Sequence, residues 1–181
     1  MSVVPYNFQK AGAQRLQELN GRALLADEMG LGKTLQCLLY MKANPKVSPV
    51  LAIVPAPVKY QWEREALSLA GIKAKVLGSH SPNRSAFAER CHLYIINYEV
   101  LTHWLPLLRT IGFQLVILDE CQYISNLYAK RTKSAIRLCD GVAHVIATSG
   151  TPMTNSPVGL YPILRILQPN QYKSFSSYAH E

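Results

Sequence analysis

Six short runs of almost continuous apolar residues constrain the fold of this chain more than any other feature. Each run is four or five residues long, and we expect strands at Arg22–Ala26, Val50–Val54, Lys73–Leu77, Leu93–Asn97, Leu115–Leu118 and Ala143–Ala147. Strands without polar alternation are typical of a parallel sheet that is covered on both faces. The apolar runs therefore predict a central parallel sheet rather than a half-exposed antiparallel one.

Between these runs lie stretches whose apolar residues recur at helical spacing. They predict helices over Phe8–Leu19, Thr34–Met41, Val58–Leu69, Asn126–Leu138 and Pro157–Leu167. Strands that alternate with helices indicate an α/β fold with helices on both faces of the sheet. A length of 181 residues fits about one domain, so we treat residues 1–181 as a single unit.

Charge and cysteine usage narrow the class of protein. The chain has 19 Lys and Arg against 11 Asp and Glu, a net charge of +8, which favours an anionic partner such as nucleic acid or a nucleotide. Solvated basic faces would explain the same charge. The four cysteines have no metal-binding spacing, and no signal peptide or membrane span is evident. We therefore expect reduced thiols in an intracellular protein, cytoplasmic or nuclear, that is neither secreted nor bound to a membrane.

The segment from Leu25 to Leu35 has the context of a phosphate-binding loop, because a strand precedes it and a helix follows. Its glycines, Gly30 and Gly32, allow backbone N–H groups to surround phosphate oxygens. Lys33 would reach the β- and γ-phosphates, and the Thr34 hydroxyl would ligate Mg²⁺. The general pattern asks for glycine where this chain has Asp27, so a glycine-rich turn without a ligand remains the alternative at this point.

A second candidate site follows the apolar run that ends at Leu118. Asp119 and Glu120 would lie at the carboxyl end of a buried strand, where two acids are costly unless they are compensated. Asp119 is placed to hold Mg²⁺, and Glu120 is placed to orient and deprotonate an attacking water. The alternative is an acidic helix N-terminus that the helix dipole stabilises.

These segments together resemble the first RecA-like lobe of superfamily 2 helicases, and among them the Swi/Snf-type DNA translocases. The resemblance follows the family's order of motifs along nearly the whole chain. It covers Pro5–Gly12, Asp27–Gln36, Ile53–Pro57 with Trp62–Glu65, Ile96–Leu101, Asp119–Gln122 and Thr148–Asn155. The family's own form of the phosphate-loop motif begins with Asp, which removes the doubt about Asp27.

The resemblance implies a RecA-like P-loop NTPase domain that uses ATP and Mg²⁺. It implies nucleotide contacts by Gln9, which reads adenine, and by Asp27, Glu28, Met29, Gly30, Leu31, Gly32, Lys33, Thr34 and Leu35. It implies catalytic roles for Lys33, Asp119 and Glu120, metal binding by Thr34 and Asp119, and coupling through Gln122, Ser149 and Thr151. Three positions depart from the family: Gln122 replaces His, Ser125 replaces Lys and Ser149 replaces Thr.

The resemblance also implies double-stranded DNA held through its backbone, without sequence reading. The expected contacts are Lys59, Arg64, Asn97 and Tyr98. Residues 121–139 contain four basic groups and no acid, which predicts either a DNA- or partner-facing patch or a solvated helix face. The four are Lys130, Arg131, Lys133 and Arg137.

We accordingly expect the N-terminal ATPase lobe of a DNA motor, without the second RecA-like lobe and its arginine finger, and therefore weak turnover by the lobe alone. The alternatives are a strand-separating or restriction-type superfamily 2 enzyme, a nucleotide-gated DNA-binding module without turnover, and a small-molecule kinase. The source, bacterial, viral or other, and the process served stay open.

Overall fold

The computed structural model describes residues 4–78, 80–153 and 157–179. Its centre is a six-stranded sheet in the order β1-β6-β5-β2-β4-β3, and every neighbouring pair is parallel. The strands are β1 (Arg22–Leu25), β2 (Val50–Val54), β3 (Ala74–Leu77), β4 (Leu93–Asn97), β5 (Leu115–Leu118) and β6 (His144–Thr148). All six expected strands are confirmed, and no end differs by more than one residue.

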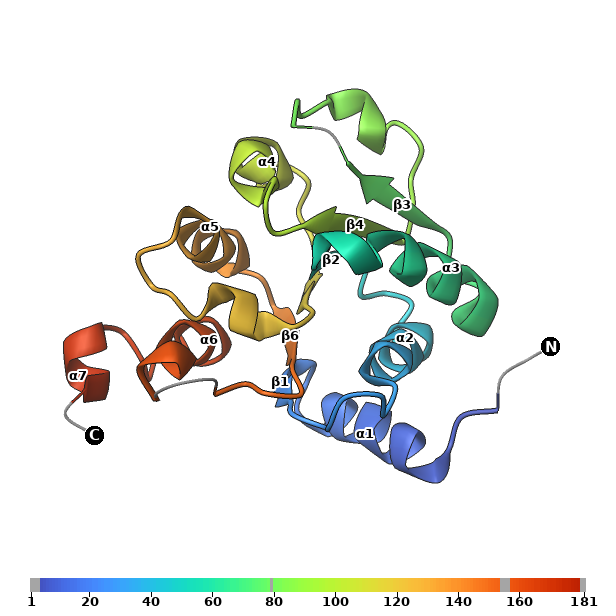
Figure 1. Cartoon of the computed structure of the whole chain (residues 1–181). Helices are drawn as coiled ribbons and strands as arrows, with labels where there is room; N and C mark the ends of the chain where they lie inside the picture. Colours follow the sequence, from blue (N-terminus) through green and yellow to red (C-terminus); the bar gives the residue numbers. More distant parts are fainter. Residues whose placement is uncertain (1–3, 79, 154–156, 180–181) are drawn as a thin grey trace.

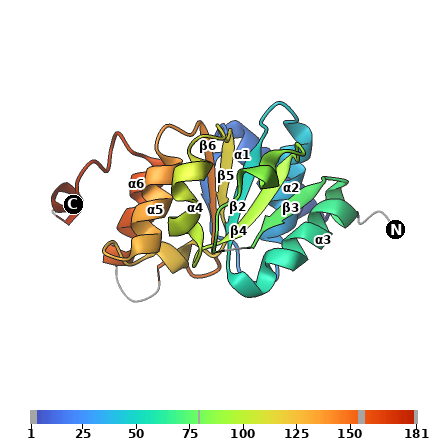
Figure 2. The same cartoon turned by 90° about the horizontal axis from the view of Figure 1, so that it is seen from above.

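Helices cover both faces of this sheet, as Figures 1 and 2 show. One face carries α1 (Asn7–Glu18), α2 (Lys33–Ala43) and α3 (Lys59–Ala70). The other carries α4 (Leu101–Leu108), α5 (Lys130–Cys139) and α6 (Tyr161–Leu167), and the short α7 (Phe175–Ala179) lies near the C-terminus. Each face has its own apolar core, and β2, β4 and β5 are buried along their whole length. The predicted doubly covered parallel sheet is confirmed.

Two of the expected helices begin four residues later than their sequence suggests. The stretch expected from Asn126 becomes helical only at Lys130, and the stretch expected from Pro157 starts as a 3₁₀ turn, η4 (Pro157–Leu160), before α6 begins. Helix α4 was not expected at all. Its Leu101, Trp104 and Leu108 are buried against the sheet. Among the described residues, no helix combines the length and apolar character needed to cross a membrane.

Arg22 fixes the end of α6 to the sheet. Its guanidinium donates hydrogen bonds to the carbonyl oxygens of Ile166 and Leu167 at 3.0 and 2.9 Å, and of Val142 at 2.9 Å. These carbonyls lie at the end of a helix and at a strand entry, where the backbone has no regular partner. A single side chain of β1 therefore satisfies groups from two other elements.

Because the strands are parallel, the loops that follow three of them lie at the same end of the sheet. The residues after β1, β5 and β6 all lie at the carboxyl ends of their strands, and β6 lies between the other two. In open α/β sheets this edge is where ligands bind. The candidate phosphate loop and the Asp119-Glu120 pair therefore share an edge although about ninety residues separate them.

Candidate active site

The loop between β1 and α2 bends at two glycines. Gly30 and Gly32 have φ angles of 84° and 73°, in the left-handed region that glycine adopts without strain. A Cβ at Gly32 would lie only 2.5 Å from the Gln9 amide nitrogen. The Lys33 ammonium, 7% exposed, donates hydrogen bonds to the carbonyl oxygens of Asp27 and Glu28 at 2.8 and 3.0 Å. The loop thus curls around its own lysine, as a phosphate-binding loop requires.

Gln9 joins α1 to this loop. Its side-chain carbonyl accepts a hydrogen bond from the Tyr6 backbone N–H at 3.0 Å, and its amide donates to the Leu31 carbonyl at 3.3 Å. Both contacts orient the Gln9 amide, which is 7% exposed. Gln9 therefore lies beside the loop, and its contact with adenine stays a prediction.

Asp27, at the departure from the general P-loop pattern, is held by a buried amide. The Gln36 side chain donates a hydrogen bond to Asp27 Oδ2 at 2.8 Å, and Gln36 is fully buried. Its other atom, Oε1, has no hydrogen-bond partner among the described residues. Gly12 leaves the room for it, since a Cβ there would lie 1.7 Å from Oε1. The sequence analysis assigned no role to Gln36, although it lies one turn after Lys33 in the same motif.

Asp119 is buried and oriented from three sides. Thr148 donates to Oδ1 at 2.7 Å, Trp62 donates to Oδ2 at 2.8 Å, and the Tyr98 hydroxyl donates to the backbone carbonyl at 2.9 Å. Burial raises the pKa of the Asp119 carboxyl, while the hydrogen bonds from Thr148 and Trp62 oppose that rise. Trp62 and Thr148 are site residues whose roles the sequence did not reveal, because neither contact is local.

Glu120 begins a line of hydrogen bonds that leaves the site. Its backbone is left-handed, with φ of 50°, which is uncommon for a residue with a Cβ. The Gln122 amide donates to Glu120 Oε2 at 2.8 Å, and the Ser149 hydroxyl donates to Gln122 Oε1 at 2.6 Å. The Thr151 N–H donates to the Ser149 oxygen at 2.9 Å. The three residues expected to couple the site to its surroundings are thus connected, and Gln122 uses both of its polar atoms.

The loop and the acidic pair face one cavity of about 430 Å³. Its lining includes nine residues expected from the sequence: Gln9, Met29, Gly30, Gly32, Lys33, Thr34, Leu35, Asp119 and Glu120. Asp27, Glu28 and Leu31 contribute backbone carbonyls to Lys33 and Gln9 instead. The remaining lining residues come from α3 and the turn before it: Val58, Gln61, Trp62, Glu65 and Leu69.

The donors in this cavity fit a magnesium-bound nucleotide. Thr34 offers a hydroxyl and Asp119 a carboxylate, the hard oxygen ligands that Mg²⁺ prefers. The Lys33 ammonium and the N-terminus of α2 supply positive charge for phosphates. In such a site Mg²⁺ would neutralise charge on the phosphate oxygens.

The residues expected to contact DNA do not form one surface. Arg64 is exposed and Lys59 is half-buried, with its ammonium 5.3 Å from the centre of the Tyr60 ring. Asn97 and Tyr98 are buried, and their side chains bond to Glu99 and to Asp119. Both side chains thus form hydrogen bonds inside this chain, and a contact of this segment with DNA stays a prediction.

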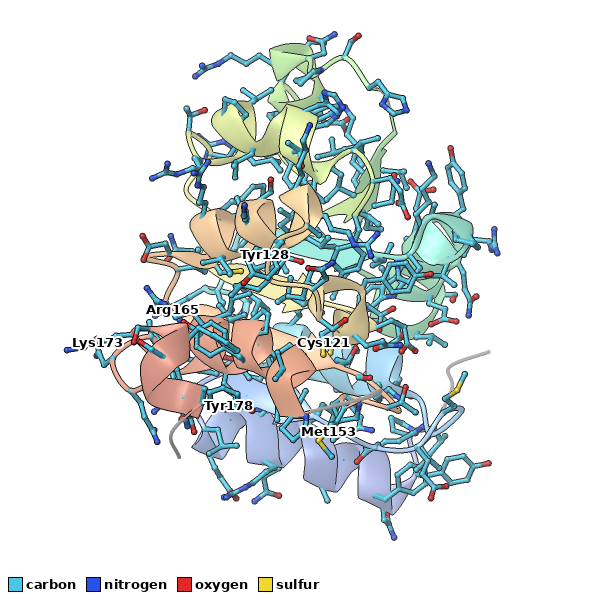
Figure 3. All side chains as sticks on the ribbon, turned by 60° about the vertical axis from the view of Figure 1, so that its left-hand side comes forward. Cys121, Tyr128, Met153, Arg165, Lys173 and Tyr178 are labelled. Atoms are coloured by element: carbon cyan, nitrogen blue, oxygen red, sulfur yellow. The ribbon has the colours of Figure 1, made fainter. Side chains whose placement is uncertain are left out.

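The basic residues of α5 lie on its solvent side. Lys130, Arg131, Lys133 and Arg137 are exposed, whereas Thr132, Ser134, Ala135, Leu138 and Cys139 are buried. Tyr128, 80% exposed, lies just before this helix, and Cys121 is buried at the start of the preceding turn (Figure 3). The helix is amphipathic, so its charges need no ligand to explain them. Thr154 and Asn155, included in the last motif, lie outside the described residues.

The fold and this cavity define a RecA-like P-loop domain. The model of the SNF2-related domain matches residues 8–181, and the chain belongs to that family. A solved structure of the SWI2/SNF2 ATPase core of Sulfolobus solfataricus in complex with double-stranded DNA has 28% sequence identity and a TM-score of 0.79. The match covers 98% of this chain and 40% of that one.

Curated relatives are matched over most of this chain but over a small part of their own length. The Bos taurus SWI/SNF-related matrix-associated actin-dependent regulator of chromatin subfamily A-like protein 1 is 29% identical, over 94% of this chain and 18% of that protein. The Homo sapiens DNA annealing helicase and endonuclease ZRANB3 is 27% identical, over 95% and 16%. The Bacillus subtilis ATP-dependent helicase/translocase YwqA, whose name is marked putative, is 31% identical, over 94% and 20%. The chain thus spans about a fifth of the length of these relatives.

Proposed function

We propose that this chain is the ATP-binding lobe of a double-stranded DNA translocase, and that it hydrolyses ATP when a second RecA-like lobe completes the site. One observation carries the proposal: Lys33 and Thr34 from one loop and Asp119 and Glu120 from another line the same cavity. Membership in the SNF2-related family supports it, as does the solved relative bound to double-stranded DNA.

In this proposal the site residues divide the chemistry among them. The Lys33 ammonium leaves the carbonyls of Asp27 and Glu28 to bind the β- and γ-phosphates. Thr34 and Asp119 hold Mg²⁺. Glu120 orients the attacking water and accepts its proton, and the Gln122 amide on Oε2 fixes the carboxylate for that task.

The hydrogen-bond line from Glu120 to Thr151 gives the proposal its coupling route. Gln122 and Ser149 connect a residue beside the γ-phosphate to the segment after β6. Lys59 and Arg64 remain the proposed contacts to the DNA backbone. A second lobe would supply the arginine finger, which is worth roughly 10³–10⁵ in rate in related enzymes. An intracellular site of action follows from DNA as the partner.

Steady-state ATP turnover by the full-length protein, with and without linear duplex DNA, tests this function. We expect DNA to stimulate turnover, and Glu120→Gln to reduce it by at least about 100-fold while ATP still binds. Lys33→Ala should weaken ATP binding itself. Glu18→Gln, on the exposed side of α1, is the matched control and should change nothing. Turnover that survives Glu120→Gln would contradict the catalytic assignment.

A strand-displacement assay separates the proposal from a strand-separating helicase. A translocase of this kind should consume ATP on duplex DNA without releasing a single strand. Release of a labelled strand at the rate of ATP turnover would favour the helicase instead.

A further inference from the structure

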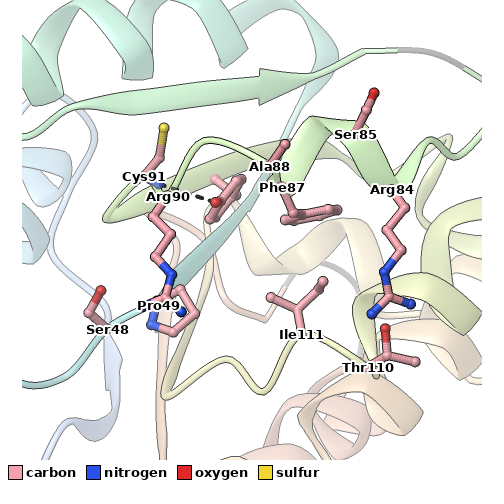
Figure 4. Close-up of a pocket in the computed structure, with 11 residues that line it drawn as sticks. Ser48, Pro49, Arg84, Ser85, Phe87, Ala88, Arg90, Cys91, Thr110 and Ile111 are labelled. Carbon is pink, nitrogen blue, oxygen red and sulfur yellow. Dashed lines mark hydrogen bonds between the residues drawn. The ribbon is translucent and has the colours of Figure 1, made fainter.

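A second, larger cavity lies at the amino ends of the strands, on the opposite side of the sheet's long axis from the nucleotide site at their carboxyl ends. It has a volume of about 770 Å³ and is walled by three chain segments: Ser48–Pro49 before β2, residues 84–91 before β4, and Thr110–Ile111 after α4 (Figure 4). These are the amino ends of β2 and β4, whereas the nucleotide cavity lies at the carboxyl ends. Nothing proposed above uses this cavity.

Two arginines flank an apolar floor in this cavity. Figure 4 shows the Arg84 and Arg90 side chains entering from opposite ends, with Phe87 and Ile111 between them. Within the described part of the chain, no acidic residue lines the cavity. Among the described residues, neither guanidinium has a partner in a hydrogen bond or an ion pair, which leaves both available to an anion.

The surrounding sequence adds positive charge, and its single acid is paired elsewhere. Residues 44–49, 82–92 and 109–114 contain Lys46, Arg84, Arg90 and Arg109, and Glu89 is their single acid. The Glu89 carboxylate forms an ion pair with Lys73 outside the cavity. Like charges around one hollow are relieved by binding an anion, and a concave, partly apolar site strengthens such an interaction.

Buried contacts hold the wall of this cavity in place. The Phe87 ring lies 4.8 Å from the Tyr94 ring and 6.5 Å from the Phe113 ring, measured between centroids. The Tyr94 hydroxyl accepts a hydrogen bond from the Cys91 N–H at 3.2 Å and donates to the Glu89 carbonyl at 3.3 Å. Because the wall is tied to the core, the two arginines flank a preformed cavity.

We propose that this cavity binds an acidic peptide segment of a partner protein, in which an apolar side chain lies between two carboxylates. The carboxylates would pair with Arg84 and Arg90, which suit them by their planar, forked donors. The apolar side chain would bury Phe87 and Ile111. A DNA backbone matches the arginines but has no protruding apolar side chain for this floor, so the lining favours a peptide over nucleic acid.

Fluorescence anisotropy of the full-length protein with labelled peptides tests the proposal. The probe has the sequence Asp-Glu-Leu-Phe-Asp-Glu, blocked at both ends. One control peptide replaces its acids by Asn and Gln, and a second replaces Leu-Phe by Ser-Ser. We expect the probe to bind, and both control peptides to bind at least about fivefold more weakly.

Protein variants locate the binding. Arg84→Ala and Arg90→Ala should each weaken binding of the probe about three- to fivefold, and the double variant about tenfold or more. Arg109→Ala, which removes an exposed cation outside this lining, is the matched control and should change binding less than about twofold. Ile111→Asp places an acid on the floor and should abolish binding. Thermal melting checks that each variant folds.

Three outcomes would overturn the proposal. If the peptide without acids binds as tightly as the probe, the cavity recognises only apolar side chains. If the Ser-Ser peptide binds as tightly as the probe, the cavity attracts only charge, without specificity. Duplex DNA that displaces the probe and depends on Arg84 and Arg90 would assign the site to nucleic acid. DNA-stimulated ATP turnover should be unchanged in the double arginine variant, so failure here is distinguishable from failure of the proposed function.

Discussion

Replacing Trp62 by Phe removes one of the two side-chain hydrogen bonds that hold the Asp119 carboxylate. The Trp62 indole N–H donates to Oδ2 at 2.8 Å, and the two side chains are 2% and 8% exposed. A hydrogen bond to a charged group contributes about 1.5–3 kcal/mol, against about 0.5–1.5 for a neutral pair. We therefore expect the free energy of unfolding to fall by about 2 kcal/mol at pH 8, beyond the cost of the smaller ring.

The stability lost in Trp62→Phe should depend on pH because the Asp119 carboxyl titrates. Burial raises its pKa above the ordinary 3.8, so the folded protein binds the proton before the unfolded chain does as the pH falls. The free energy of unfolding therefore decreases as the pH rises between the ordinary and the raised pKa. Loss of the Trp62 bond raises that pKa further. The difference in the free energy of unfolding between the native protein and the variant should thus be largest at pH values above the raised pKa. It should shrink by about 1 kcal/mol at lower pH, where the carboxyl is neutral.

Urea unfolding of the native protein and the variant between pH 4 and pH 8 measures this difference. Leu101→Ala is the control, because Leu101 is fully buried, carries no polar side-chain atom and packs in the core on the other face of the sheet. The stability that this variant loses should not change with pH. A loss of stability in Trp62→Phe that is equal at all pH values would refute the reasoning.

Three further predictions concern packing, thiols and coupling. Gly12→Ala should lower the free energy of unfolding by about 1–3 kcal/mol in urea titrations, because its Cβ would overlap Gln36 Oε1. This loss is expected although alanine favours a helix more than glycine does. An equally stable variant would show that Gln36 moves freely. Burial raises the pKa of Cys121 and of Cys139 to about 12, and all four cysteines are buried. Iodoacetamide at pH 8 should therefore leave them unmodified by mass spectrometry until urea unfolds the chain, and rapid native labelling would contradict this. Ser149→Ala breaks the line from the site and should reduce DNA stimulation of ATP turnover more than turnover without DNA; equal loss of both rates would argue for a merely local role.

The strands could be predicted because their burial on both faces leaves a continuous apolar run. Helix α4 was missed although its buried Leu101, Trp104 and Leu108 have helical spacing. Pro106 lies inside it, and proline normally disfavours a helix interior. The late start of α5 has a different cause, since the apolar residues before Lys130 belong to a turn and a loop rather than to the helix.

The candidate site was predictable in its local motifs and not in its long-range contacts. Lys33 and Thr34 follow from a strand-loop-helix pattern within a few residues. Trp62 and Thr148 reach Asp119 across 57 and 29 positions, and only the strand order brings them together. The burial of Tyr98 was not predictable for the same reason, because its motif did not reveal that the ring faces the interior.

The position of β6 has a consequence for how the molecule is made. Among the described strands, β1 hydrogen-bonds only to β6, which is the last strand along the chain and separates β1 from β5. During synthesis, β1 and the phosphate loop leave the ribosome while β6, the strand that pairs with β1, is still untranslated. The two halves of the cavity can come together only after Thr148 has left the exit tunnel, so a chain released between Glu120 and Thr148 carries the residues of both loops without the strand that joins them.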